Sequence, residues 1–217
     1  PRCSDLIILE GEGGLQNRPM DFFDKILPQL GVQIKSDNGH LPLEIKGPLQ
    51  PADISVDGSL SSQFLTGLLF AYGASVKYPV TISVNDLKSK PYIDLTMDVM
   101  RHFGYNIIHE NYEHFIINPK NDVADTVIHY TVEGDWSSAS FLMVAGAIAG
   151  SVKISGLDKN SSQADKAIIN VLRACGAELI ISDDVTQVNK AELKALTFDA
   201  TDCPDLFPPL VTLAAYC

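Results

Sequence analysis

The sequence predicts an α/β (α+β) fold that is assembled from repeated βαβαββ units with buried helices. Apolar residues make up 46% of the 217 residues and charged residues only 20%, which suits a sizeable core and argues against long disordered tracts. A short pattern also occurs twice, because "VDGSLSSQFL" starts at Val56 and "VEGDWSSASF" starts at Val132. Both copies run from valine, an acid and glycine through Ser-Ser into an apolar helix, and such self-similarity indicates a repeated structural unit.

A second segment recurs after each of these motifs. "SKPYIDLTMDVMRHFGYNI" starts at Ser89 and "SSQADKAIINVLRACGAEL" starts at Ser161, while "NRPMDFFDKILPQLGVQI" at Asn17 has the same form as the first of them. Each reads as an amphipathic helix that ends at a glycine and continues into a strand. We expect a left-handed C-cap at these glycines. They are Gly31, Gly104 and Gly176.

In chain order, each unit reads as a strand, a buried helix, a strand, an amphipathic helix and a hairpin. In the best-preserved copy the predicted pieces are 53–57, 61–72, 79–85, 91–103, 105–109 and 113–117. β-Branched residues in "VKYPVTISV" favour a strand. The helices that contain Phe64 and Phe141 are apolar nearly all round, so we expect each to be covered on every side.

The repeats also suggest how the chain is divided. We expect residues 1–133 to form a partial first lobe of about two units, and residues 134–217 to begin a second lobe with one unit and the start of the next. The hinge would then lie near Glu133–Gly134. Since the chain opens at Pro1 without a methionine and stops at Cys217 within an apolar helix, we expect it to be a piece of a longer protein.

The totals exclude several classes of function. A formal net charge of −11 argues against a nucleic-acid partner, although local donors can still bind small anions. No apolar run reaches the roughly 18 residues that span a bilayer, and no signal-peptide pattern opens the chain, so we expect no membrane partner. The four cysteines form no CxxC pair and the histidines lie singly, so the sequence predicts no metal site.

The hydroxyl cluster before the first apolar helix is the clearest candidate site. Ser59 or Ser61 suits the N-cap of that helix, whose first turn offers unpaired N–H groups and the positive end of the helix dipole. The side chains of Ser61, Ser62 and Gln63 add neutral donors, and together they suit a phosphate or carboxylate. Plain capping is the alternative, and it explains one serine well but three poorly.

Three further places carry polar groups at helix starts. Ser89 and Lys90 precede a proline that suits the first helical turn, and Arg18 holds the matching place in the earlier copy. A surface cap and a solvated arginine are the alternatives. Asp205 precedes the last apolar helix, where a carboxylate is either an N-cap or a general base. Asp135 matches Ser59 in the repeat, and its charge would repel an anion from that helix.

The ordered set of motifs resembles one enzyme family. "DGSLSSQFLTGLLFA", "LKSKPYIDLTMDVMRHFG", "YTVEGDWSSASFLMVAGAI" and "DCPDLFPPLVTLAA" together are similar to 3-phosphoshikimate 1-carboxyvinyltransferase, the EPSP synthase of aromatic amino-acid biosynthesis in the shikimate pathway. The resemblance implies the enolpyruvyl transferase fold, with two lobes of three βαβαββ units each. It also implies a cytoplasmic transferase, monomeric at full length and without cofactor or metal, whose partners are the small molecules phosphoenolpyruvate and shikimate 3-phosphate.

The resemblance also implies roles for single residues in binding shikimate 3-phosphate. Ser61 and Ser62, joined by Ser89, match residues that hold the phosphate of that substrate. Gln63 and Tyr92 match residues beside the shikimate ring.

For phosphoenolpyruvate, the resemblance implies that Arg18 is a ligand together with Gln63, and that Asp205 is the catalytic residue that shuttles the proton of the 5-hydroxyl. The family's segments that carry most of the positive charge for neutralising the two anionic substrates have no counterpart in the 217 residues, so we expect the chain alone to be inactive. Trp136 stands where the family commonly has a small residue, which puts the start of that helix in doubt.

Two alternatives stay open from the sequence. A UDP-N-acetylglucosamine enolpyruvyl transferase has the same fold, although "SKPYID" favours the shikimate enzyme. A non-catalytic binding module that retains the fold is the other.

Overall fold

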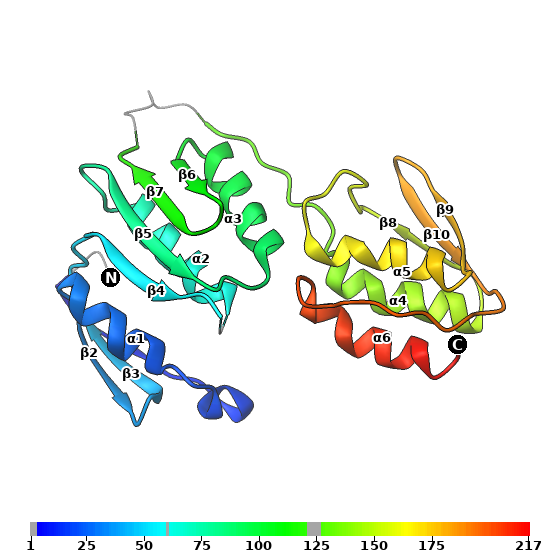
Figure 1. The fold of residues 1–217 in the computed structure, drawn as a ribbon, viewed down its shortest axis with the longest axis horizontal. Helices are drawn as coiled ribbons and strands as arrows, with labels where there is room; N and C mark the ends of the chain where they lie inside the picture. Colours follow the sequence, from blue (N-terminus) through cyan, green and yellow to red (C-terminus); the bar gives the residue numbers. More distant parts are fainter. Residues whose placement is uncertain (1–3, 60, 121–126) are drawn as a thin grey trace. The chain divides into compact units, whose positions relative to one another are not determined.

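The computed structural model describes residues 4–59, 61–120 and 127–217 (Figure 1). Its contacts divide the chain into unit 1, residues 1–88 and 96–126, and unit 2, residues 89–95 and 127–217. The division therefore runs through one helix. The lobe boundary that the sequence suggests at Glu133–Gly134 stays a prediction.

Unit 1 holds two sheets, one of order β1-β3-β2 and one of order β4-β5-β7-β6. Its strands are β1 (Leu6–Leu9), β2 (Gln33–Asp37), β3 (His40–Lys46), β4 (Ile54–Asp57), β5 (Val80–Asn85), β6 (Asn106–Glu110) and β7 (His114–Asn118). Its helices are η1 (Gly13–Asn17), α1 (Asp21–Ile26), η2 (Leu27–Leu30) and α2 (Ser62–Gly73), and α3 (Lys90–His102) ends in this unit. Strands β4 and β5 are parallel, and the other pairs of the two sheets are antiparallel.

The order β4-α2-β5-α3-β6-β7 confirms the predicted βαβαββ unit, with bounds close to those expected from the sequence. Its core lies between α2 and the four-stranded sheet, where Leu69, Tyr72, Ile82 and Phe115 are fully buried. The buried hydroxyl of Tyr72 donates to the carbonyl oxygen of Ala52 at 2.8 Å, which satisfies the one polar atom that this ring brings into the core.

Unit 2 holds an antiparallel sheet of order β8-β10-β9 with helices packed against it. Its elements are α4 (Trp136–Ala149), β8 (Val152–Ser155), η3 (Ala164–Ala167), α5 (Ile168–Ala174), β9 (Glu178–Ile181), β10 (Val185–Asn189), η4 (Pro204–Leu206) and α6 (Phe207–Ala214). Trp136, Met143, Ile168 and Leu172 are fully buried in its core. The strand expected before α4 is absent from the described residues, where Gly134 N–H donates to Gly156 O at 2.8 Å without a ladder.

The expectation that both apolar helices are covered on every side is wrong for the described chain. Phe70 of α2 is 47% exposed, and Phe141 and Leu142 of α4 are 49% and 54% exposed. Helix α4 packs on β8, β10, α5 and α6, and these neighbours leave the side that carries Phe141 and Leu142 open. Each of the two apolar helices is therefore buried on part of its surface and carries apolar side chains that are exposed on the rest.

The left-handed caps that the sequence predicts are confirmed. The three glycines after the amphipathic helices have positive φ, at 72° for Gly31, 79° for Gly104 and 92° for Gly176, as left-handed caps require. Within the part of the chain that the structure describes, no helix combines the length and the apolar character that crossing a membrane demands.

Candidate functional site

The parallel strands β4 and β5 end side by side, and the loops that follow them lie against each other. Asp57 is opposite Asn85 at the carboxyl ends of the two strands. Gly58 N–H donates to Asn85 O at 2.8 Å, and Lys88 N–H donates to Gly58 O at 3.3 Å. Ligands of α/β sheets bind outside the carboxyl ends of parallel strands, so this edge is where a site is expected.

Gly58 makes the close approach of these loops possible. A Cβ atom at this position would lie 2.7 Å from Val84 Cγ1 and 2.9 Å from the Cα atom of Leu87. The second contact is with the main chain, which cannot move aside as a flexible side chain does. The glycine of "VDGSLSS" is therefore needed for the packing of the two loops.

Helix α2 begins at this edge with the predicted hydroxyl cluster. Ser61 is its N-cap, and its Oγ accepts the N–H of Gln63 at 3.2 Å. Ser59, the other predicted cap, instead donates its N–H to Asp57 Oδ1 at 2.8 Å. Ser62 is buried in the first turn, whereas the Gln63 side chain is exposed. The three predicted donors Ser61, Ser62 and Gln63 are thus gathered at one helix start.

Aromatic packing fixes the position of this first turn. Phe64 stacks on Phe22 of α1, with ring centroids 4.7 Å apart and planes inclined by 13°. It also meets Phe23 edge to face at 5.3 Å. Because such aromatic pairs contribute beyond the area they bury, α1 anchors the turn that carries the three donors.

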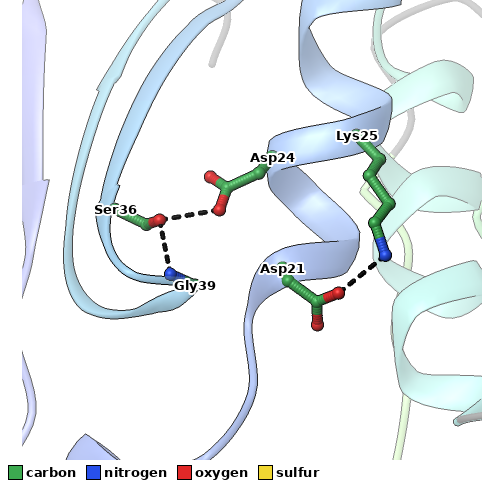
Figure 2. A network of polar contacts seen from close by, with 5 residues as sticks. All are labelled: Asp21, Asp24, Lys25, Ser36 and Gly39. Carbon is green, nitrogen blue, oxygen red and sulfur yellow. Dashed lines mark hydrogen bonds and ion pairs between the residues drawn. The ribbon is translucent and has the colours of Figure 1, made fainter.

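Helix α1 is in turn tied to the β2–β3 turn, as Figure 2 shows. Ser36 Oγ donates to Asp24 Oδ2 at 2.6 Å and accepts the N–H of Gly39 at 2.9 Å. Met20 N–H donates to Gly39 O at 2.6 Å, which fixes the chain just after Arg18. Arg18 itself follows η1 with an exposed side chain, and within the described residues no hydrogen bond or ion pair joins it to the cluster on α2. The described contacts therefore do not link Arg18 to the serines, and its place in the site stays a prediction.

Charged groups of α1 also act on the loop after β4. Lys25 pairs with Asp21 at 2.7 Å (Figure 2), and this hydrogen bond raises the pKa of Lys25. The pKa of Asp57 is lowered, chiefly by hydrogen bonds from Ser59, with the charge of Lys25 helping. Asp57 is thus ionised at neutral pH and holds the loop that leads to the helix cap.

Ser89 and Tyr92, the next two predicted residues, fall in the part of α3 and its loop that belongs to unit 2. Ser89 follows Lys88 directly and has φ of 54°. The Tyr92 hydroxyl donates to both carboxylate oxygens of Asp165, at 3.0 and 3.2 Å. Burial, followed by the charge of Asp165, raises the pKa of Tyr92, so its phenol stays protonated and able to donate.

Asp165 is a buried carboxylate, 3% exposed, that lies within electrostatic range of the predicted catalytic residue. Burial raises the pKa of Asp165, the charges of Asp205 and Asp135 raise it further, and the hydrogen bond from Tyr92 opposes them. Asp205 lies exposed in η4, directly before α6. Tyr92 therefore contacts Asp165, and the charge of Asp205 acts on it, although the sequence analysis did not select Asp165.

The repeat held a signal for Asp165. When "SSQADK" is matched to "SKPYID", Asp165 stands at the place of Ile93, which is fully buried in α3. A carboxylate at a position that another copy fills with a core isoleucine breaks the apolar pattern. Such exceptions concentrate at functional sites.

The start of α4 differs from that of α2. Asp135 is the N-cap of α4, and its carboxylate accepts the N–H groups of Ser137 and Ser138 at 3.0 and 3.2 Å. The helix thus begins at Trp136, whose buried indole N–H donates to Asp158 O at 3.2 Å. Because the cap carboxylate already takes these donors, the start of α4 offers less to an anion than the start of α2.

Two further observations concern metal-ligating side chains and the thiol of Cys203 in the described part of the chain. It contains no group of three or more His, Cys, Asp and Glu side chains that could hold a metal ion. Burial, aided by the charge of Asp165, raises the pKa of Cys203 to about 11, so this thiol is protonated and a poor nucleophile at neutral pH.

Comparisons with known proteins agree on one family. The family model for EPSP synthase (3-phosphoshikimate 1-carboxyvinyltransferase) matches residues 1–217. The chain is 37% identical over 214 residues to the 3-phosphoshikimate 1-carboxyvinyltransferase of Clostridium novyi (strain NT), covering 99% of this chain and 49% of that protein. It also superposes on the EPSP synthase of Acinetobacter baumannii with a TM-score of 0.69 at 25% identity, covering 98% of this chain and 49% of that one.

A second solved structure supports the fold alone. The enolpyruvyl transferase NikO of Streptomyces tendae matches with a TM-score of 0.68 at 17% identity, covering 98% of this chain and 51% of that one. The chain spans about half the length of the curated relatives it matches.

Proposed function

Because the chain belongs to the EPSP synthase family, we propose that it takes part in the transfer of an enolpyruvyl group from phosphoenolpyruvate to the 5-hydroxyl of shikimate 3-phosphate. The observation that carries the proposal is the start of α2 at the carboxyl ends of the parallel strands β4 and β5. A capped helix start with three neutral donors suits a phosphate monoester, which is the anionic group of this substrate.

In this proposal Ser61 and Ser62 bind the phosphate of shikimate 3-phosphate, and Ser89 joins them. Ser61 Oγ accepts the N–H of Gln63, so its own O–H proton is left to donate to the phosphate. The N–H groups of the first turn add the positive end of the helix dipole. Gln63, whose side chain is exposed, would contact the shikimate ring and phosphoenolpyruvate.

Tyr92, Arg18 and Asp205 complete the proposed set. Tyr92 would lie beside the shikimate ring, with its hydroxyl held by Asp165. Arg18 would bind phosphoenolpyruvate, since its exposed guanidinium matches the geometry of a carboxylate or phosphate.

Asp205 would act as the general base. It takes the proton of the 5-hydroxyl while the hydroxyl oxygen bonds to C2 of phosphoenolpyruvate and the methylene carbon gains a proton. Loss of that proton and of inorganic phosphate from the tetrahedral intermediate then restores the double bond. Positioned bases of this kind contribute about a hundredfold to ten-thousandfold in rate.

Several finer statements belong to the same proposal. We place the reaction in the cytoplasm, with small molecules as partners and a monomer at full length, as expected for a biosynthetic enzyme of this family. We also propose that the 217-residue chain alone binds shikimate 3-phosphate without turnover. The relatives' names favour the shikimate substrate over the nucleotide sugar UDP-N-acetylglucosamine.

Titration calorimetry of the 217-residue chain tests the substrate class. We expect saturable binding of shikimate 3-phosphate and none of UDP-N-acetylglucosamine at the same concentrations. Binding of the nucleotide sugar would favour the other transferase, and binding of neither would favour a non-catalytic module. A phosphate-release assay with both substrates tests the second statement, and turnover by the chain alone would contradict it.

A further inference from the structure

Unit 2 contains a cavity of about 540 Å³ whose wall is unusually basic for a chain of net charge −11. Lys159, Lys166 and Arg173 line it, and its wall includes no carboxylate side chain. We propose that this cavity binds a small metabolite through a phosphate monoester. A volume of this size is typical of sites for small ligands.

Lys166 supplies a fixed positive charge. Its ammonium donates to the carbonyl oxygens of Ser161 at 2.5 Å and Lys159 at 3.3 Å, which holds the side chain against the loop before η3. An ammonium group has three N–H donors, so one is left for a ligand. The two carbonyls fix the group without neutralising its charge.

Ser161 adds a buried donor in the same wall. It is 6% exposed, and its Oγ accepts the N–H of Gln163 at 3.0 Å. Since the hydroxyl oxygen is already an acceptor in that contact, its own proton is free to point to a ligand oxygen. This arrangement differs from a solvated surface serine, because Ser161 is buried and its Oγ is held by the N–H of Gln163.

Further donors follow along η3 and α5. Lys166, Asn170 and Arg173 are four and then three residues apart, so they lie on one side of the helical segment, and all three line the cavity. Lys159 is paired with Asp183, whereas Lys166 and Arg173 form no ion pair with any described residue. Two positive charges of the wall are therefore uncompensated.

A phosphate monoester fits these donors better than other anions. It offers three acceptor oxygens and close to two negative charges at neutral pH, which suits a guanidinium fork, a fixed ammonium and a hydroxyl. Ile169 and Ile181 line the same cavity and provide apolar contact for the organic part of the ligand. The proposal does not rest on the proposed function, because none of the residues that line the cavity is among those proposed to bind shikimate 3-phosphate or phosphoenolpyruvate.

Amide NMR shifts during titration with phenyl phosphate or inorganic phosphate test the site, with sodium chloride holding the ionic strength constant. The chain carries Ser61→Ala and Ser62→Ala throughout, which removes the hydroxyls of the α2 start. We expect saturable shifts at Ser162, Gln163 and Asn170, with phenyl phosphate binding more tightly than inorganic phosphate. Shifts that grow linearly without saturation, or that are confined to unit 1, would overturn the proposal.

Variants then assign the donors. Lys166→Met or Arg173→Gln should weaken phenyl phosphate binding about tenfold or more, because each removes a charged donor. Lys153→Met removes an exposed lysine of β8 outside the cavity and is the matched control. Arg173 is exposed, so its variant is expected to fold normally, which circular dichroism checks. Equal affinity in Arg173→Gln and Lys153→Met would contradict the assignment.

Discussion

Ser61 combines two tasks that a single substitution to alanine cannot separate. Its Oγ caps α2 by accepting the N–H of Gln63, and the same hydroxyl is proposed to bind a phosphate. Loss of a serine N-cap to alanine costs about 1 kcal/mol, whereas replacement by glycine costs only about a few tenths. Glycine at this position therefore removes the hydroxyl and keeps most of the helix stability.

We predict that Ser61→Gly lowers affinity for shikimate 3-phosphate severalfold while the free energy of unfolding changes little. Ser61→Ala should lower both the affinity and, by about 1 kcal/mol, the free energy of unfolding. Calorimetric titration and urea unfolding measure the two effects. Ser59→Ala is the control for loss of a hydroxyl beside the cap. It leaves the cap at Ser61 and the Ser59 backbone N–H that bonds Asp57 in place, and it removes only the Ser59 hydroxyl that also bonds Asp57. Unchanged affinity in Ser61→Gly would show that the hydroxyl only caps the helix.

The buried carboxylate of Asp165 predicts a pH dependence of stability. Its pKa is raised in the folded state, chiefly by burial, so folding is favoured while the group is protonated in both states. Stability is then lost as the pH rises from about 4, the ordinary pKa, through the folded pKa. Asp165→Asn removes this titration and keeps an oxygen that accepts from Tyr92.

We therefore expect the free energy of unfolding of Asp165→Asn, relative to the unmodified chain, to increase between pH 4 and pH 7. Chemical denaturation at a series of pH values measures it. Asp202→Asn, which changes an exposed carboxylate, is the matched control. The prediction would be contradicted if the free energies of unfolding of Asp165→Asn and the unmodified chain differed by the same amount at every pH in this range.

At the scale of elements, the starts of α2 and α4 show what the repeat did and did not predict. The motifs align, yet the cap is Ser61 in one copy and Asp135 in the other, and Asp135 aligns with Ser59 rather than with Ser61. Helix α4 can begin earlier because Trp136 is held by Asp158 and by the Gln163 side chain. These partners lie far along the chain, so local sequence could not reveal the shift.

Asp135→Ala should lower the free energy of unfolding by about 1 kcal/mol at pH 7 through loss of the α4 cap. Hydrogen bonds from Ser138, above all from its hydroxyl, lower the pKa of Asp135. The carboxylate therefore contributes to the free energy of unfolding above its ordinary pKa, and this contribution is lost as the pH falls through the folded pKa. The free energy of unfolding of Asp135→Ala should thus approach that of the unmodified chain below about pH 4. Asp135→Asn retains a capping oxygen and should be milder at pH 7, whereas equal losses for both variants would contradict the capping role.

The order of elements was predictable because hydrophobic periodicity and glycine caps are local signals. The helix expected at 61–72 is Ser62–Gly73, and the strand expected at 79–85 is Val80–Asn85. Burial was less predictable, since composition cannot say which side of an apolar helix has a neighbour, as Phe141 shows. The contact between Tyr92 and Asp165 depends on the tertiary structure, and only the break in the repeat at Ile93 pointed to Asp165.

At the scale of the whole chain, each unit has a core of its own. Leu69 is fully buried in unit 1, beneath the four-stranded sheet, and Leu172 is fully buried in the core of unit 2. Cooperative opening units commonly follow such contiguous cores. A leucine-to-alanine change at a fully buried position lowers the free energy of unfolding by about 2–5 kcal/mol, because it loses the transfer free energy of the removed atoms and leaves a cavity. We expect a loss of this size at either position.

Leu69→Ala and Leu172→Ala form a mirrored pair that tests whether the units open separately. We expect Leu69→Ala to lower hydrogen-exchange protection of core amides in unit 1, such as Ile82, by about 2–5 kcal/mol, with Met143 of unit 2 nearly unchanged. Leu172→Ala should do the reverse. Each variant serves as the control for the other, because both make the same chemical change at a fully buried site. Equal loss at Ile82 and Met143 in both variants would show instead that the chain opens as one cooperative unit, because the cavity in one core would then lower the stability of both.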